Sequence, residues 1–195
     1  TLSRRDPDYV PRAKAAAALE STRAAGKVPA ALADTLHALG LDTHSLSRLH
    51  IGSVIFANKP GDGSAREQAA SCQKVLGGFA NICYEFATKR YRSNCINWGI
   101  LPFTLDKDAA FDYEPGDCVF VPAIRKAIEE SSEDIPAKVI RKDGSVHDLL
   151  LHVRGLTADE KEILLDGCLM NYYAKPDKDH TKAKQRPKKK RSKKK

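Results

Sequence analysis

An alternation of strand and helix over residues 51–105 constrains the fold of this chain more than any other feature of its sequence. The predicted strands are 51–57, 79–84 and 100–105, and the predicted helices between them are 64–76 and 85–98. Each helix runs into glycine, a residue that commonly follows a helix end. Because a helical crossover lets successive strands pair in parallel, we expect an α/β fold with a mixed or parallel sheet flanked by helices.

The pattern changes after Pro115-Gly116, where shorter strand signals follow one another. Apolar alternation on both sides of Asp143-Gly144 is typical of a β-hairpin, because Asp-Gly favours the tight turn that joins two strands. Thr157 and Glu160 have the spacing of a capping box and predict the start of a last helix. The elements expected in this half are strands at 118–121, 137–141 and 146–153 and helices at 124–131 and from 157 onward.

Two further segments flank this region. Residues 8–26 and 29–40 have helical patterns and predict a helical hairpin in front of the main domain. Residues 175–195 hold 12 of the 33 Lys and Arg residues and 2 of the 25 Asp and Glu residues, so the rest of the chain is close to neutral. We therefore divide the chain into an N-terminal helical extension at 1–49, an α/β domain at 50–174 and a basic tail of the disordered type at 175–195.

Composition excludes several classes of protein. No apolar run reaches the roughly 18 residues that a membrane-spanning helix needs, which predicts a soluble protein with no membrane partner. The five cysteines are scattered and contain no C-x-x-C, and the six histidines show no ligand spacing. This pattern predicts free, mostly buried thiols in a reducing compartment, with no metal or iron–sulfur site in this chain.

The segment Gly61-Asp-Gly-Ser-Ala-Arg-Glu-Gln-Ala-Ala70 is the strongest candidate for a site. Glycines let the backbone approach a ligand, Ser64 stands at an expected helix start that favours anions, and Arg66 offers a planar fork for a carboxylate or phosphate. The same residues also fit an ordinary capping box formed by Ser64 and Glu67, and the residues alone favour that simpler interpretation.

A second basic segment, Lys89-Arg90-Tyr91-Arg92, lies on the next predicted helix. A solvated helix face is the interpretation we favour for it, and a phosphate contact is the alternative. Trp98 and the pair Tyr172-Tyr173 are expected to pack in the interior.

The tail is the strongest signal that is not catalytic. It has almost no apolar residues, so it cannot fold alone, and a dense polyanion such as folded RNA would bind it. The nucleic-acid-binding residues predicted on this basis are Lys182, Lys184, Arg186, Lys188, Lys189, Lys190, Arg191, Lys193, Lys194 and Lys195.

The motif at 61–70, followed by Leu76-Gly77-Gly78 and by Gly99-Ile-Leu-Pro-Phe103, resembles the C-terminal swivel domain of aconitases and isopropylmalate isomerases. Residues 61–70 and 89–97 are most similar to bacterial aconitase-like hydratases. The resemblance covers about two thirds of the chain. It implies that Ser64 is the catalytic base and that Arg66, with Gly63, binds a substrate carboxylate. Ala65 departs from the family's usual second serine.

The resemblance also implies what is missing. In that family the cluster-binding cysteines and the acid–base Asp and His residues lie in three preceding domains, and none of them is present here. The chain alone is therefore expected to be inactive and to carry no cofactor.

Two functions follow. We favour a swivel domain recruited as a non-catalytic, RNA-binding structural subunit of a ribonucleoprotein, with a mitochondrial ribosome as the expected assembly and neighbouring ribosomal proteins as partners. The alternative is the small subunit, or a C-terminal fragment, of an iron–sulfur hydro-lyase, with a four-iron four-sulfur cluster on a large partner subunit. The expected compartment is mitochondrial, or otherwise cytoplasmic.

Overall fold

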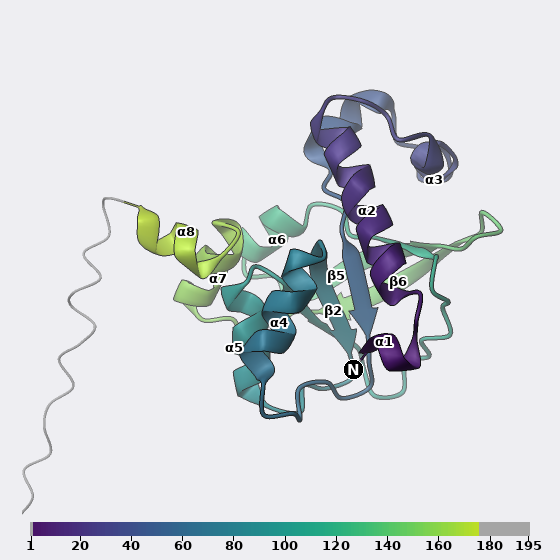
Figure 1. Ribbon diagram of the computed structural model, residues 1–195. Coiled ribbons are helices and arrows are strands. Elements are labelled where there is room, and N and C mark those ends of the chain that lie inside the picture. Colours follow the sequence, from purple (N-terminus) through teal and green to yellow (C-terminus); the bar gives the residue numbers. More distant parts are fainter. Residues whose placement is uncertain (1, 176–195) are drawn as a thin grey trace, which may run out of the picture.

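The computed structural model describes residues 2–175, and in this part of the chain all strands join one six-stranded sheet (Figure 1). The strands are β1 (Ser53–Phe56), β2 (Gly78–Cys83), β3 (Leu101–Thr104), β4 (Cys118–Phe120), β5 (Asp134–Ile140) and β6 (Val146–His152). The helices are α1 (Leu2–Arg5), α2 (Tyr9–Ala24), η1 (Ala30–Leu32), α3 (Ala33–Ala38), η2 (Thr43–Arg48), α4 (Arg66–Val75), α5 (Lys89–Asn97), α6 (Ile124–Glu129), α7 (Ala158–Leu165) and α8 (Leu169–Ala174). The α/β class with a mixed sheet, predicted from the sequence, is confirmed.

The sheet has the order β1-β2-β3-β6-β5-β4 and consists of two halves. β1, β2 and β3 are parallel, with α4 and α5 as their crossovers, whereas β6, β5 and β4 are antiparallel. The halves join where Thr104 of β3 pairs with His152 of β6. The His152 ring is buried, and its Nδ1 lies 2.7 Å from Oδ1 of Asp134 on the neighbouring strand.

Parallel pairing places the carboxyl ends of β1 and β2 at one edge of the sheet, and the chain leaves both strands toward the starts of α4 and α5. The two connecting loops run side by side there. The amide of Ala87 donates to the Pro60 carbonyl at 2.9 Å, and the amide of Tyr84 donates to the Asn58 carbonyl at 3.2 Å. This edge, outside the carboxyl ends of parallel strands, is where ligands of open α/β sheets bind.

Alternation along the strands divides the interior into two layers. Ile82, Phe103 and Leu151 belong to the main core on one face of the sheet. On the other face α4 and α5 pack side by side over the parallel half, as Figure 1 shows, with Ala70 and Cys95 buried between them and the sheet.

The N-terminal segment is packed against the α/β domain. α2 lies along the β1 side of the sheet, and the Glu20 carboxylate accepts a 2.8 Å hydrogen bond from the amide of Ile51 just before β1. Burial raises the pKa of Glu20, but hydrogen bonds from Arg23 and Ile51 outweigh it, so the pKa lies below its ordinary value. A boundary at residue 50 stays a prediction.

Most expected elements are present, and the differences lie at their ends. α5 begins at Lys89 rather than at residue 85, because the Thr88 hydroxyl accepts from the amide of Tyr91 and fixes the helix start there. The capping box of Thr157 and Glu160 is confirmed at α7. Within residues 2–175, no helix is both long enough and apolar enough to cross a bilayer.

Candidate functional site

The loop between β1 and α4 is fixed to the start of α5 through Gly61. Its φ is +97°, and a Cβ at this position would lie 2.5 Å from side-chain atoms of Tyr91, so only glycine fits. The Gly61 carbonyl accepts from Arg66 Nε at 3.1 Å and from the Thr88 hydroxyl at 3.2 Å. One backbone carbonyl thus links Arg66 on α4 to the cap of α5.

Ser64 does not cap α4, and the predicted capping box is wrong. The helix begins at Arg66 after Ala65 in the N-cap position, and no side chain bonds to its first-turn amides. Ser64 stands one residue too early for the cap. The Glu67 carboxylate instead accepts a 2.5 Å hydrogen bond from the Trp98 indole of α5. The Ser64 side chain is exposed, and the start of α4 has no side-chain cap.

Ser64 and Arg66 line an open hollow between the starts of α4 and α5, which we call the α4–α5 cleft. Its volume of about 590 Å³ falls in the range of small-molecule sites. The residues that line it are Ser64, Ala65, Arg66, Glu67, Gln68, Lys89, Arg90, Ser93 and Asn94. The lining carries three cationic side chains, those of Arg66, Lys89 and Arg90, and one carboxylate, that of Glu67. The Glu67 carboxylate accepts a hydrogen bond from the Trp98 indole. The net charge of the lining is therefore positive, and the cleft suits an anion.

Gly63 lies beside this cleft and is exposed. A Cβ on Gly63 would meet no atom of this chain within 4 Å, so nothing inside the chain requires glycine there. Its role in approaching a substrate stays a prediction.

A buried polar network joins the two helices that form the cleft. Gln73 of α4 donates to Asn81 of β2 at 2.8 Å, and Asn81 donates to the hydroxyl of Tyr91 and the sulfur of Cys95 on α5, both at 3.3 Å. All four side chains are buried. Because buried polar groups must keep their partners, this network fixes α4 and α5 relative to each other. Sequence reasoning missed it, since isolated Gln and Asn residues carry no pairing signal.

The basic segment of α5 divides into different roles. Tyr91 is buried, and burial raises its pKa. Arg92 donates to the Glu160 carboxylate at 3.2 Å and to the Arg154 carbonyl at 3.0 Å, so it ties α5 to the α7 region. Lys89 and Arg90 are the members of this segment that line the cleft. The prediction that the segment Lys89-Arg90-Tyr91-Arg92 forms a solvated helix face is therefore wrong for Tyr91 and Arg92.

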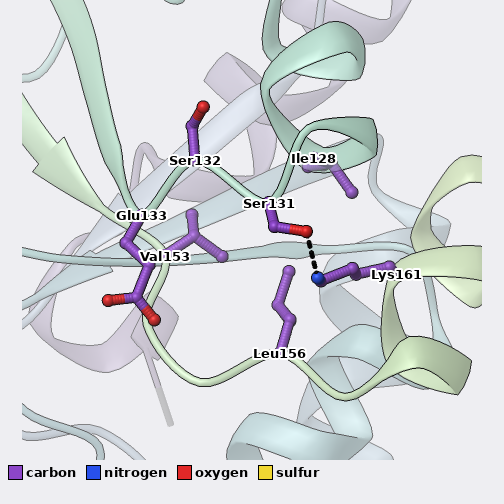
Figure 2. Close-up of a pocket in the computed structure, with 7 residues that line it drawn as sticks. All are labelled: Ile128, Ser131, Ser132, Glu133, Val153, Leu156 and Lys161. Carbon is purple, nitrogen blue, oxygen red and sulfur yellow. Dashed lines mark hydrogen bonds between the residues drawn. The ribbon is translucent and has the colours of Figure 1, made fainter.

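A smaller hollow lies between α6 and α7 (Figure 2). Its volume is about 70 Å³, and Ile128, Val153 and Leu156 supply apolar walls. Lys161 donates to the Ser131 hydroxyl across it, as Figure 2 shows. The space holds little more than one or two waters, so it does not suit an organic substrate.

The cysteines of the described residues do not form a cluster site. Residues 2–175 contain no group of three or more His, Cys, Asp and Glu side chains placed to hold a metal ion. Burial raises the pKa of Cys95 to about 11 and that of Cys83 to about 12, and a raised pKa opposes the thiolate form that iron requires. A four-iron four-sulfur cluster therefore does not fit this part of the chain.

The same burial makes a testable prediction. At pH 8 in the folded protein, Cys83 and Cys95 should react with iodoacetamide at least about 10²-fold more slowly than the exposed Cys72, because only thiolates react and few form at a raised pKa. Mass spectrometry of alkylated peptides measures each site. In urea all three sites should react at similar rates. Rapid labelling of Cys95 without urea would contradict the buried network.

Comparison with known proteins assigns the family. Residues 46–108 match the Aconitase C-terminal domain family. The 3-isopropylmalate dehydratase small subunit of Metallosphaera sedula is 36% identical over 136 residues, which cover 69% of this chain and 73% of that protein. The chain belongs to the aconitase family. The methanogen homoaconitase small subunit of Methanocaldococcus jannaschii is 33% identical and is covered over 70% of its length.

Longer family members match only at one part of their chains. This chain spans 13% of aconitate hydratase A of Bradyrhizobium diazoefficiens and 15% of a putative mitochondrial aconitate hydratase of Emericella nidulans. Among solved structures, 3-isopropylmalate dehydratase of Methanocaldococcus jannaschii is 28% identical, with a TM-score of 0.41 over 69% of this chain and 71% of that one.

The family assignment overturns the RNA-binding function that we favoured from the sequence. The relatives are hydratases and dehydratase or homoaconitase small subunits, and none of those named above is a ribosomal protein. The prediction failed because a Lys/Arg run is basic in any context and does not specify RNA. The nucleic-acid-binding residues predicted at 182–195 lie outside the described part of the chain. The compartment stays a prediction.

Proposed function

We propose that the chain is the small, swivel-domain subunit of an iron–sulfur hydro-lyase of the aconitase family and acts with a separate subunit that carries the cluster. The observation that carries this proposal is the match to two small subunits over 70% or more of their length. Both relatives are named as small subunits, and the matched region makes up most of each of them.

The α4–α5 cleft gives the chain a role in the reaction. Arg66 binds a substrate carboxylate through the edge of its guanidinium, while its Nε remains on the Gly61 carbonyl at 3.1 Å. Ser64 then takes the proton from the carbon next to that carboxylate. To act as a base Ser64 must first be an alkoxide, and the open first turn of α4 and the neighbouring cations stabilise that negative oxygen before the transfer. The transfer leaves a neutral hydroxyl on Ser64 and the electron pair of the broken C–H bond on the substrate carbon.

The partner must supply what this chain does not hold. The cleft is open on one side, and the cysteines of residues 2–175 do not fit a cluster. We therefore place the cluster on the partner subunit and the proton-transfer residues on both chains, with the cleft facing the partner.

Reconstitution tests the proposal. The chain is co-expressed with a cluster-bearing large subunit of the same organism and assayed with 3-isopropylmalate, homocitrate and citrate by the ultraviolet absorbance of the unsaturated product. Activity should require both subunits, because each holds part of the site. Absence of any stable complex, or full activity of the large subunit alone, would refute the proposal.

A further inference from the structure

The wall of the cleft formed by α5 carries its own set of polar side chains. Lys89, Arg90, Ser93 and Asn94 follow one another at the spacing of a single helix face and line the hollow opposite Ser64. The other face of α5 holds Tyr91, Cys95 and Ile96, which are buried. The helix therefore presents a polar face to the cleft while its apolar face holds it against the domain.

Lys89 and Arg90, the two cations on this wall, form no ion pair with any described residue. Among the described residues no carboxylate forms an ion pair with Lys89 or Arg90, although their neighbour Arg92 pairs with Glu160 at 3.2 Å. Glu67 is the one carboxylate in the lining, and the Trp98 indole donates to it. Two exposed positive charges thus remain beside Arg66 without an ion-pair partner among the described residues, and the lining keeps a net positive charge.

The distance between this wall and Arg66 is held by the fold. The Gly61 carbonyl binds Arg66 on one side and the Thr88 cap of α5 on the other. Beneath them Gln73 and Asn81 join α4, β2 and α5. The start of α5, which carries Lys89 and Arg90, is therefore held at a set distance from Arg66, and only the ends of these two side chains need to adjust to a ligand.

We propose that Lys89 and Arg90 bind a second anionic group of the substrate, at the end away from the carboxylate that Arg66 holds. The site then takes a polycarboxylate whose branch ends in a carboxylate and disfavours one whose branch ends in an alkyl group. This inference rests on the proposed function, because it concerns the same cleft, and it names Lys89 and Arg90 as residues that determine specificity.

The experiment compares two probes of similar size. Propane-1,2,3-tricarboxylate and 2-isobutylbutanedioate differ in one branched end group of similar size, which is a charged carboxylate in the first and a neutral isopropyl group in the second. Amide NMR titrations of the whole chain at constant ionic strength give the dissociation constant of each. The tricarboxylate should bind at least about fivefold more tightly, as charge-assisted contacts to exposed cations predict, and should shift amides of α4 and α5.

The variant Arg90→Gln should remove most of this preference and leave the weaker binding of the dicarboxylate unchanged, because Arg66 still holds it. Lys126→Gln is the matched control, since Lys126 is an exposed lysine of α6 already near Glu130. It should change neither constant. Equal binding of both probes, equal loss in Lys126→Gln, or shifts spread over all basic surfaces would overturn the inference.

The outcome is separable from that of the proposed function. If the preference depends on Arg90 but no partner restores activity, the anion site stands and the enzymatic role fails. If the reconstituted enzyme is active but its ratio of kcat/KM for homocitrate over 3-isopropylmalate is the same in Arg90→Gln, the assignment of Lys89 and Arg90 is wrong and the hydro-lyase function stands.

Discussion

In the reconstituted hydro-lyase, Ser64→Ala should lower kcat by about 10²- to 10⁴-fold, the range expected when a positioned acid–base group is lost. The hydroxyl is the atom that we assign to proton transfer, and alanine leaves nothing to replace it. KM should change little, because Arg66 and the other cations of the cleft still hold the substrate. Steady-state kinetics of the assembled enzyme measures both constants.

The same helix offers the control. Ser71 also lies on α4, and its hydroxyl donates to the Gln68 carbonyl at 3.1 Å, away from the cleft lining. Ser71→Ala should keep wild-type kcat, and both variants should keep the wild-type melting temperature. A Ser64→Ala enzyme with more than about a tenth of wild-type kcat would remove Ser64 from the proton-transfer step.

Arg66→Lys separates charge from geometry at the same site. Lysine retains the positive charge but loses the planar fork and the Nε bond to the Gly61 carbonyl. We expect KM to rise about tenfold or more, the equivalent of losing one charge-assisted hydrogen bond, with a smaller loss of kcat. An effect on kcat alone would place Arg66 in the chemical step and not in binding.

Hydrophobic alternation and glycine placement were enough to predict the sheet class and the order of its elements. The parallel half followed from the two helical segments between strands, and the hairpin of β5 and β6 followed from Asp143-Gly144. These signals are local, and in this chain the tertiary packing agrees with them. Their ends were less certain, since the cap of α5 depended on Thr88 rather than on the preceding apolar residues.

The site was predictable in its residues but not in its geometry. Ser64 and Glu67 have the spacing of a capping box, yet α4 begins one residue later than that box requires, and Glu67 bonds to the indole of Trp98, 31 positions away. A contact so distant in sequence has no local signature. The sequence showed Lys89 and Arg90 as a basic segment but not their position beside Arg66, because only the parallel pairing of β1 and β2 brings the start of α5 beside that of α4.

Gly99→Ala should be among the most destabilising single substitutions of the chain, at about 2–5 kcal/mol, because two costs add. Gly99 follows α5 with φ of +66°, which costs an L-residue about 1–2 kcal/mol. A Cβ there would also lie 1.7 Å from the carbonyl oxygen of Gly167, and a backbone shift to relieve such overpacking costs a further 1–3 kcal/mol or so. Urea unfolding followed by circular dichroism measures the loss.

Gly144→Ala is the matched control for that loss, because it shares the backbone conformation without the contact. Gly144 has φ of +83°, but a Cβ at that position would meet nothing within 4 Å. It should therefore lose only the conformational cost of about 1–2 kcal/mol. Gly99 lies where the ends of α5 and α7 meet. The backbone shift in Gly99→Ala should therefore also weaken the packing of Ile96 against Ile163. If the two variants unfold at the same urea concentration, the close approach of Gly99 to Gly167 does not exist in solution.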